Sequence, residues 1–178
     1  MMGTRCGDLD PAVPEYLVRV TGQSAAEVDH LLNHQSGLKG ICGVHDMREV
    51  HRLIDAGDAA ARLAFDMFCH RIRKYVGAYT AVLGRVDALV FTGGIGEHDA
   101  RTRAAVCAGL EETFGIVVDP QANLSTDGNL AAIHAQHSRV SILTIPTDEE
   151  LAIARQTVAL LDSRRGGGAD NREEVANG

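Results

Sequence analysis

The sequence contains no tryptophan, and its aromatic residues make up only 4% of 178 residues. Proteins that bind single-stranded nucleic acid usually stack the bases on aromatic rings, so few side chains here suit that role. Positive charge is also scarce, because 17 Lys and Arg stand against 24 Asp and Glu, for a formal net charge of −7. Since binding to a phosphate backbone depends on cationic side chains, we expect no nucleic acid partner.

Long hydrophobic runs and paired cysteines are also missing. No apolar stretch approaches the ~20 residues that span a bilayer, and the start MMGTRCGDLD is unlike a secretory signal peptide. The cysteines lie far apart, without a C-x-x-C pair, at Cys6, Cys42, Cys69 and Cys107. Because a chain of this size without an export signal usually keeps its thiols reduced, we expect a cytoplasmic protein with free cysteines and no membrane association.

The hydrophobic content of 45% is enough for one domain with a buried core. Helical and strand periodicities alternate along the chain, which predicts an α/β fold. The predicted helices cover 11–22, 25–34, 47–56, 59–84, 99–113 and 147–161, the strands 86–91, 115–119 and 138–146, and the loops 36–46 and 123–129. The polar, glycine-rich end is predicted to be a disordered tail over 163–178, which leaves residues 1–162 as the folded part.

Several of these helices carry recognisable start signals. Ser24 with Glu27, and Thr147 with Glu150, have the spacing of capping boxes, and Asp58 is placed to cap the helix over 59–84. The apolar residues of that long helix predict one broad buried face, formed by Leu63, Phe65, Met67, Phe68, Ile72, Val76 and Tyr79. The strand over 86–91 is nearly continuous in apolar residues, so we expect it to be buried on both faces.

A glycine-rich turn follows this strand in the stretch VFTGGIGEH. Gly93, Gly94 and Gly96 allow positive φ and a close approach of backbone N–H groups to an anion at the start of a helix. The turn is not a dinucleotide-binding fingerprint, because Asp99 stands where the third glycine would be, and no Lys-Ser/Thr of a P-loop follows. Phosphate binding and a tight structural turn both remain open.

A second acidic stretch, PTDEE, follows the strand over 138–146. Asp148, Glu149 and Glu150 at a helix start are favourable for the helix dipole alone. For the alternative, a Mg²⁺ ligand, Glu149 is the best candidate, because Glu150 would be engaged in the capping box.

Two stretches place an arginine beside carboxylates. Arg5 in GTRCGDLDP is suited to contact a phosphoryl or carboxylate group, and a surface salt bridge explains it equally well. In HDMR, Asp46 is explained as a helix cap without any further role.

Two histidine pairs have a spacing seen in metal sites, His30 with His34 and His134 with His137. No third ligand accompanies either pair, so we interpret them as ordinary surface histidines.

Taken together and in this order, five stretches resemble the C-terminal part of the acetokinase family, acetate kinase. They are MGTRCGDLDP, SGLKGICGVHDMR, RIRKYVGAYTA, VFTGGIGEH and IPTDEELAIAR, and the resemblance runs from Met2 to about residue 160. It implies the C-terminal domain of the sugar kinase/heat-shock ATPase/actin-like (ribonuclease H-like) fold, incomplete in this chain. It also implies reversible transfer of the γ-phosphoryl of ATP to acetate, giving ADP and acetyl phosphate, with Mg²⁺ or alternatively Mn²⁺.

The resemblance also implies roles for individual residues. Arg5 corresponds to an arginine that stabilises the transition state, and Glu149 to the carboxylate linked to Mg²⁺. The nucleotide-contacting segments correspond to Asp46, Met47 and Arg48 beside the adenosine, and to Gly94, Ile95, Gly96, Glu97 and His98 along the nucleotide. Met47, His98 and Asp148 depart from the family, which often has Phe, Asn and Asn at these places, so an aromatic wall beside adenine is lost at Met47.

By the same resemblance, the family's catalytic Asp, its histidines that steady the transferring group and most of its acyl pocket lie upstream of this stretch. We therefore expect a truncated gene product, or one with a late start codon, that has little activity alone. Two alternatives remain: part of a propionate or butyrate kinase, and a non-catalytic remnant that binds nucleotide or dimerises. The family's C-terminal domain supplies its dimer contact, and the helix over 59–84 is a candidate for that contact in a homodimer.

Overall fold

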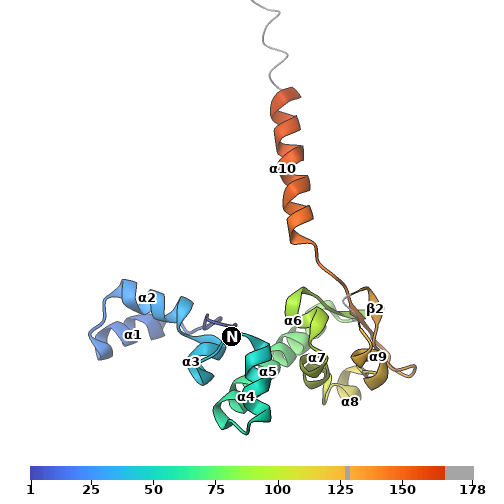
Figure 1. The fold of residues 1–178 in the computed structure, drawn as a ribbon, viewed down its shortest axis with the longest axis horizontal. Helices are drawn as coiled ribbons and strands as arrows, with labels where there is room; N and C mark the ends of the chain where they lie inside the picture. Colours follow the sequence, from blue (N-terminus) through green and yellow to red (C-terminus); the bar gives the residue numbers. More distant parts are fainter. Residues whose placement is uncertain (127–128, 167–178) are drawn as a thin grey trace, which may run out of the picture. The chain divides into compact units, whose positions relative to one another are not determined.

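The computed structural model describes residues 1–126 and 129–166, which form two compact units. The first is Met1–Ile145 and the second is Pro146–Gly178 (Figure 1). The described part of the second unit contains α10 (Glu149–Gly166). This helix continues past residue 162, and the rest of the predicted disordered tail lies outside the described residues, so its disorder stays a prediction.

The chain begins with two capped helices. α1 (Ala12–Thr21) ends at Gly22, which has a left-handed φ of 71°. α2 (Ala25–His34) begins at the predicted capping box, which is confirmed: the backbone N–H of Ser24 donates to Glu27 Oε2 at 2.7 Å, and that of Glu27 donates to Ser24 Oγ at 3.3 Å. Local side-chain spacing therefore determines where α2 begins.

The loop predicted over 36–46 is wrong in its first half, because residues Gly37–Cys42 form helix α3. Its first N–H groups are satisfied from a distant segment: Leu38 N donates to Met2 O at 2.9 Å and Lys39 N donates to Gly3 O at 3.0 Å. Such tertiary partners are not visible in a local pattern, and they allow a helix with two glycines to form.

Helices α4 (Met47–Asp55) and α5 (Ala59–Leu83) follow. The predicted cap of α5 is confirmed, since Ala61 N donates to Asp58 Oδ1 at 2.8 Å. α5 packs against α3, α4 and α7 (Figure 1). Its small residues Ala61 and Ala64 lie in the core.

The single buried face predicted for α5 is only partly right. Phe65 is buried, but Leu63, Met67 and Tyr79 are 55%, 44% and 61% exposed. The helix is 25 residues long, and the elements packed on it in the described residues cover a narrower stripe than its apolar residues span.

The α/β class is confirmed by a sheet of three strands in the described residues, in the order β1-β3-β2. β1 (Ala88–Phe91) runs parallel to β3 (Ser141–Thr144), with Leu89 opposite Ile142, and β2 (Ala131–Ala132) is antiparallel to β3. Burial of β1 on both faces is wrong, because Val90 is 44% exposed while Phe91 is buried. The predicted strand over 115–119 makes only one bridge, between Val118 and His134.

The helix predicted over 99–113 is interrupted. α7 (Ala100–Cys107) ends before Gly109, whose φ of +81° breaks a helix, and α8 (Glu111–Phe114) follows. α9 (Pro120–Leu124) then occupies the start of the loop predicted over 123–129, and Asp119 Oδ1 caps it by accepting the N–H of Ala122 at 2.9 Å.

All four cysteines are free thiols, as predicted. Cys69 and Cys107 lie in the core, and burial raises the pKa of each thiol to about 12. No helix in the described part of the chain is both long and apolar enough to cross a lipid bilayer.

Candidate functional site

The segment that carries Arg5 is fixed by backbone hydrogen bonds to the start of α3. The carbonyls of Met2, Gly3 and Thr4 accept N–H groups from Leu38, Lys39 and Ser36 at 2.9–3.0 Å. Gly37 has a φ of +63°, and a Cβ there would collide with the carbonyl oxygens of Met2 and Arg5. The Arg5 side chain is exposed, and no hydrogen bond or ion pair holds it among the described residues. A free guanidinium on a fixed backbone is well suited to bind an anion.

The start of α4 carries Asp46, Met47 and Arg48. Asp46 Oδ1 accepts the N–H of Arg48 at 2.9 Å as a helix cap, and the Arg48 guanidinium pairs with the same carboxylate at 2.5 Å. The hydrogen bond from the Arg48 side chain is the largest cause that lowers the pKa of Asp46 to about 2. Met47 points the other way and is only 5% exposed in the core. Asp46 and Arg48 therefore lie on the surface, and Met47 anchors α4.

The predicted glycine turn is itself a short helix, α6 (Gly93–His98), which corrects the expectation of a loop. A side chain of the same helix binds its N-terminal end, because Gly93 N donates to Glu97 Oε1 at 2.7 Å. Glu97 is buried, and Ile95 packs against the core. His98 is exposed, and its Nε2 lies 3.8 Å from Glu97 Oε2.

The glycines of α6 have different surroundings. Gly96 lies against β1, since a Cβ there would be 3.1 Å from the carbonyl carbon of Phe91. A Cβ at Gly94 would meet nothing within 4 Å. Gly96 is thus explained by close helix–strand packing, whereas Gly94 faces open space and is free to approach a ligand.

Arg103 on α7 is a residue that the sequence analysis missed. Its side chain is fully buried, and its guanidinium donates to oxygens of α6, of Asn123 in α9 and of Thr126 just beyond α9. Arginine is rarely buried, so nothing in the sequence singled it out. The apolar context of the segment AAVCAGL is the only local signal that this part of α7 is enclosed.

Two contacts connect α4 to the start of α7. His51 Nε2 lies 2.7 Å from Asp99 Oδ2, and Arg101 donates to Asp55 at 2.9 Å. Burial raises the pKa of Asp99, but hydrogen bonds from Thr102 and His51 outweigh it and lower the pKa overall. Asp99 directly follows α6, so these contacts relate the segment 46–48 to the segment 94–98.

The Arg5 segment joins the same region. Gly3 lies against His45, because a Cβ at Gly3 would be 3.3 Å from the His45 carbonyl oxygen. Packing at Gly3 and the contacts of Asp99 and Arg101 thus link, through neighbouring residues, the segments 3–5, 46–48 and 94–98 of the first unit.

Glu149 belongs to the second unit, as the first residue of α10. Asp148 Oδ1 accepts the N–H of Leu151 at 2.8 Å, which adds a cap directly before α10, and the capping box of Thr147 and Glu150 stays a prediction. The selection of Glu149 over Glu150 as the metal ligand depends on that capping box and likewise stays a prediction. Glu149 is exposed, and its role rests on the resemblance.

The histidine pairs form no metal site in the described residues. The His30 and His34 rings lie 4.8 Å apart between centroids, and His134 Nδ1 accepts the N–H of Ile142 at 3.2 Å. Within residues 1–126 and 129–166, no three His, Cys, Asp or Glu side chains are grouped so that they could hold a metal ion. Mg²⁺ usually keeps several waters and binds one or two carboxylates together with substrate phosphates, so a single carboxylate such as Glu149 is compatible with it.

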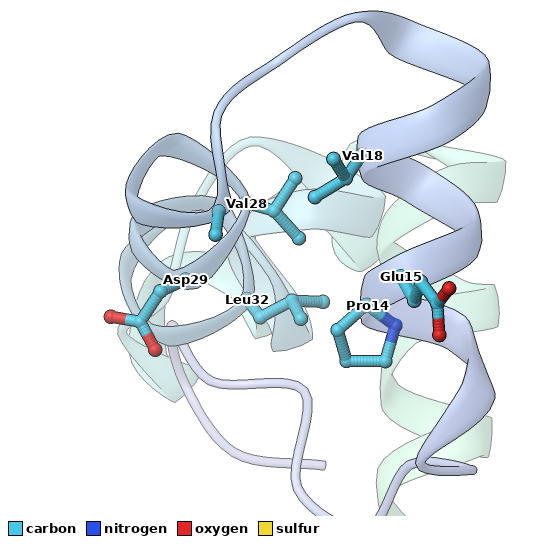
Figure 2. A pocket seen from close by; sticks show the side chains of 7 residues that line it. Pro14, Glu15, Val18, Val28, Asp29 and Leu32 are labelled. Carbon is cyan, nitrogen blue, oxygen red and sulfur yellow. The ribbon is translucent and has the colours of Figure 1, made fainter.

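A hollow of about 500 Å³ lies between α1 and α2, away from these segments. Figure 2 shows Pro14, Val18, Val28 and Leu32 directed toward one another, with the carboxylates of Glu15 and Asp29 directed outward; Ala25 completes the lining. None of the site residues predicted from the sequence lines it. It is the apolar seam between two packed helices.

The sequence model of the acetokinase family matches residues 1–155. The chain belongs to the acetokinase family. Acetate kinases of Sulfurovum sp. (strain NBC37-1) and Syntrophobacter fumaroxidans are 54% and 55% identical over 161 and 174 residues, which cover 90% and 97% of this chain. The predicted resemblance to acetokinases is thereby confirmed.

Solved structures give the same result. The Porphyromonas gingivalis acetate kinase matches 90% of this chain with a TM-score of 0.83 and 44% identity. A Francisella tularensis propionate kinase matches 86% with a TM-score of 0.79 and 43% identity. The chain spans about 40% of the length of the relatives it matches, in both comparisons.

Proposed function

We propose that this chain forms the C-terminal nucleotide-binding part of an acetate kinase, in the actin-like fold. The reaction is reversible transfer of the γ-phosphoryl group of ATP to acetate, giving ADP and acetyl phosphate. The observation that supports this most strongly is the extent of the family match, which includes every segment from Arg5 to Glu149 that carries a proposed site residue. ATP or ADP, and acetate or acetyl phosphate, are the proposed ligands.

Each residue has a physical role in this proposal. The exposed Arg5 guanidinium donates hydrogen bonds to the phosphoryl group as negative charge builds up during transfer. Asp46 and Arg48 contact the adenosine from the exposed start of α4, and Gly94 and His98 contact the nucleotide from the open side of α6. Met47, Ile95, Gly96 and Glu97 act indirectly, because they pack inward and hold these backbones in place.

A divalent cation is a further part of the proposal. Mg²⁺, or Mn²⁺ as the alternative, neutralises phosphate charge when it is bound, and Glu149 is the residue of this chain proposed to hold it. Its carboxylate is exposed at the start of α10, where it is accessible to a metal ion.

The proposal predicts weak turnover by this chain alone. Phosphoryl transfer depends on positioning and charge neutralisation by many groups together, and the chain matches only about 40% of its relatives. We therefore expect the 178-residue chain to bind nucleotide and to make little acetyl phosphate.

Calorimetric titration with Mg·ADP, with an acetyl phosphate turnover assay on the same sample, tests this proposal. Binding that disappears in EDTA, with turnover near background, supports it. An Asp46→Ala variant should bind more weakly, whereas Glu15→Ala on α1 should bind as the unmodified chain does. Absence of Mg·ADP binding would refute the nucleotide role, and substantial turnover would refute the expectation of an incomplete catalytic site.

Propionate is a second candidate substrate. The Francisella propionate kinase is 43% identical to this chain and the Porphyromonas acetate kinase is 44% identical, so sequence identity does not separate the two substrates. Butyrate is the related alternative. Comparing acetate, propionate and butyrate as phosphoryl acceptors, in a preparation that supplies the remainder of the enzyme, decides among them. An inert remnant is the outcome in which neither binding nor turnover is found.

We further propose a cytoplasmic homodimer that binds neither nucleic acid nor membrane. The exposed apolar residues of α5 are the candidate contact, and they include Tyr75, Tyr79, Val82 and Leu83. Sedimentation analysis across a concentration range tests this, because replacing Val82 and Leu83 with Ser should shift a dimer toward the monomer.

A further inference from the structure

Helix α6 is short and poorly suited to form on its own. It has six residues, and three of them are Gly93, Gly94 and Gly96. Glycine disfavours a helix, and a helix this short gains too few internal hydrogen bonds to offset its nucleation cost. Its geometry therefore depends on contacts from outside the helix.

Arg103 supplies contacts at the C-terminal end of α6. One terminal nitrogen, Nη1, donates to the carbonyl oxygens of Gly96 at 2.9 Å and Glu97 at 2.8 Å. The last carbonyls of a helix have no partner within it, so these two bonds satisfy groups that would otherwise be buried without one. Glu97 holds the N-terminal end through Gly93 N, so α6 is held at both ends.

The rest of the guanidinium binds a different segment. Nε donates to Asn123 Oδ1 at 2.7 Å, and Nη2 donates to Asn123 O at 2.7 Å and to Thr126 Oγ1 at 2.8 Å. All five N–H groups of the arginine thus have oxygen acceptors, and none of these acceptors is a carboxylate. Lysine has three N–H donors and no planar fork, so it is not able to reproduce this arrangement.

We propose that Arg103 is a positioning residue for nucleotide binding: it ties the end of α6 to the end of α9 and so fixes the backbone that presents Gly94 and His98. This inference rests on the proposed nucleotide role of α6. It concerns the interior of the protein, because the Arg103 side chain is fully buried and does not reach a ligand.

The test compares Arg103→Lys with Arg101→Lys on the same helix. Both changes keep the charge, but Arg101 is partly exposed and donates to Asp55. Two readouts are needed: hydrogen exchange at the amides of 93–99, and Kd for Mg·ADP. We expect Arg103→Lys to speed exchange in this segment and to raise Kd about tenfold, since at least two of five hydrogen bonds are lost. Arg101→Lys should change neither.

Thr126→Val is the second variant, for the case in which Arg103→Lys does not fold. It removes one acceptor of the guanidinium at a partly exposed position, and we expect a smaller change of the same sign in both readouts. Unchanged exchange in Arg103→Lys, or in Thr126→Val if only that variant folds, overturns the inference, and so does faster exchange with an unchanged Kd. If the unmodified chain does not bind Mg·ADP, the proposed function fails and the positioning role for nucleotide falls with it, whereas the exchange data still show whether Arg103 holds α6.

Discussion

The start of α4 and helix α6 carry most of the proposed nucleotide contacts, and they are held in place in opposite ways. Asp46 and Arg48 are two residues apart and satisfy each other on the surface. The backbone of α6 is instead held at its end by Arg103, which also binds Asn123 and Thr126. The start of α4, whose side chains pair with each other, should tolerate changes elsewhere in the chain. Helix α6, which depends on Arg103, should respond to substitutions far from any ligand.

The largest effect is expected for Asn123→Ala. This change removes the acceptor of Arg103 Nε and the donor to the carbonyl of Ala100, at a side chain that is 2% exposed. We expect a loss of about 2–3 kcal/mol in the free energy of unfolding, because buried polar groups are left without partners. Urea denaturation followed by circular dichroism measures it. Asn33→Ala on α2, where the amide donates only to Asp29, is the control and should cost clearly less. Equal losses would contradict a special role for the contacts around Arg103.

Asp99→Ala tests the connection between the two regions. Asp99 caps α7 by accepting the N–H of Thr102 at 3.0 Å and also contacts His51 on α4, so we expect a loss of about 1–2 kcal/mol near neutral pH. The folded-state pKa of Asp99 is lowered, so its stabilisation is present above the ordinary pKa of 3.8 and is lost as the pH falls through the folded value. The melting temperatures of both proteins, measured between pH 7 and pH 3, should therefore draw closer together as the pH falls. Asp66→Ala, at an exposed position on α5, should match the unmodified chain at every pH.

Gly94→Ala separates helix stability from ligand binding. The added methyl group meets nothing within 4 Å, so the better helix propensity of alanine should stabilise the chain by up to about 1 kcal/mol. The same methyl group lies on the side proposed for the nucleotide and should raise Kd for Mg·ADP. Gly96→Ala is the matched comparison, because its Cβ would press on Phe91 and offset the gain in propensity. A stabilised Gly94→Ala protein with unchanged Kd would show that this face of α6 does not contact the nucleotide.

The smallest effect on stability is expected for Asp46→Asn at the start of α4, where Asp46 and Arg48 pair with each other. Because Arg48 lowers the pKa of Asp46 to about 2, its stabilisation is present above the ordinary pKa of 3.8 and is lost between there and pH 2. The ion pair is exposed, so the difference in melting temperature should be small near neutral pH and should weaken at high salt. A difference that does not shrink between pH 4 and pH 2 would mean that the charge of Asp46 is not its cause.

The same contrast explains which parts of the structure were predictable. The caps at Ser24 and Asp58 were correct because each depends on residues within three positions of it in the sequence. The helix Gly37–Cys42 was missed because its first N–H groups bind carbonyls of residues 2 and 3, and the helix Gly93–His98 was missed because its end depends on Arg103.

The candidate site also has features that the sequence predicts and features that it does not. Residue types and their order were sufficient to select Arg5, Asp46 and Gly94 and to identify the family. They did not reveal that Met47 and Glu97 are buried, since burial depends on which elements pack together. The exposed Leu63, Met67 and Tyr79 show the converse, because an apolar pattern predicts a face to be covered without specifying what covers it.

The reactivity of the two buried thiols can be used to measure how often the core opens. Cys69 lies in α5 and Cys107 at the end of α7, and a thiol whose pKa is raised to about 12 is almost entirely protonated and unreactive at neutral pH. A maleimide or aromatic disulfide reagent should therefore modify the half-buried Cys6 and Cys42 first, and reach Cys107 only when α7 opens. The rate at which Cys107 is modified would report how often the helix that carries Arg103 leaves its place, with a native thiol of the chain as the reporter.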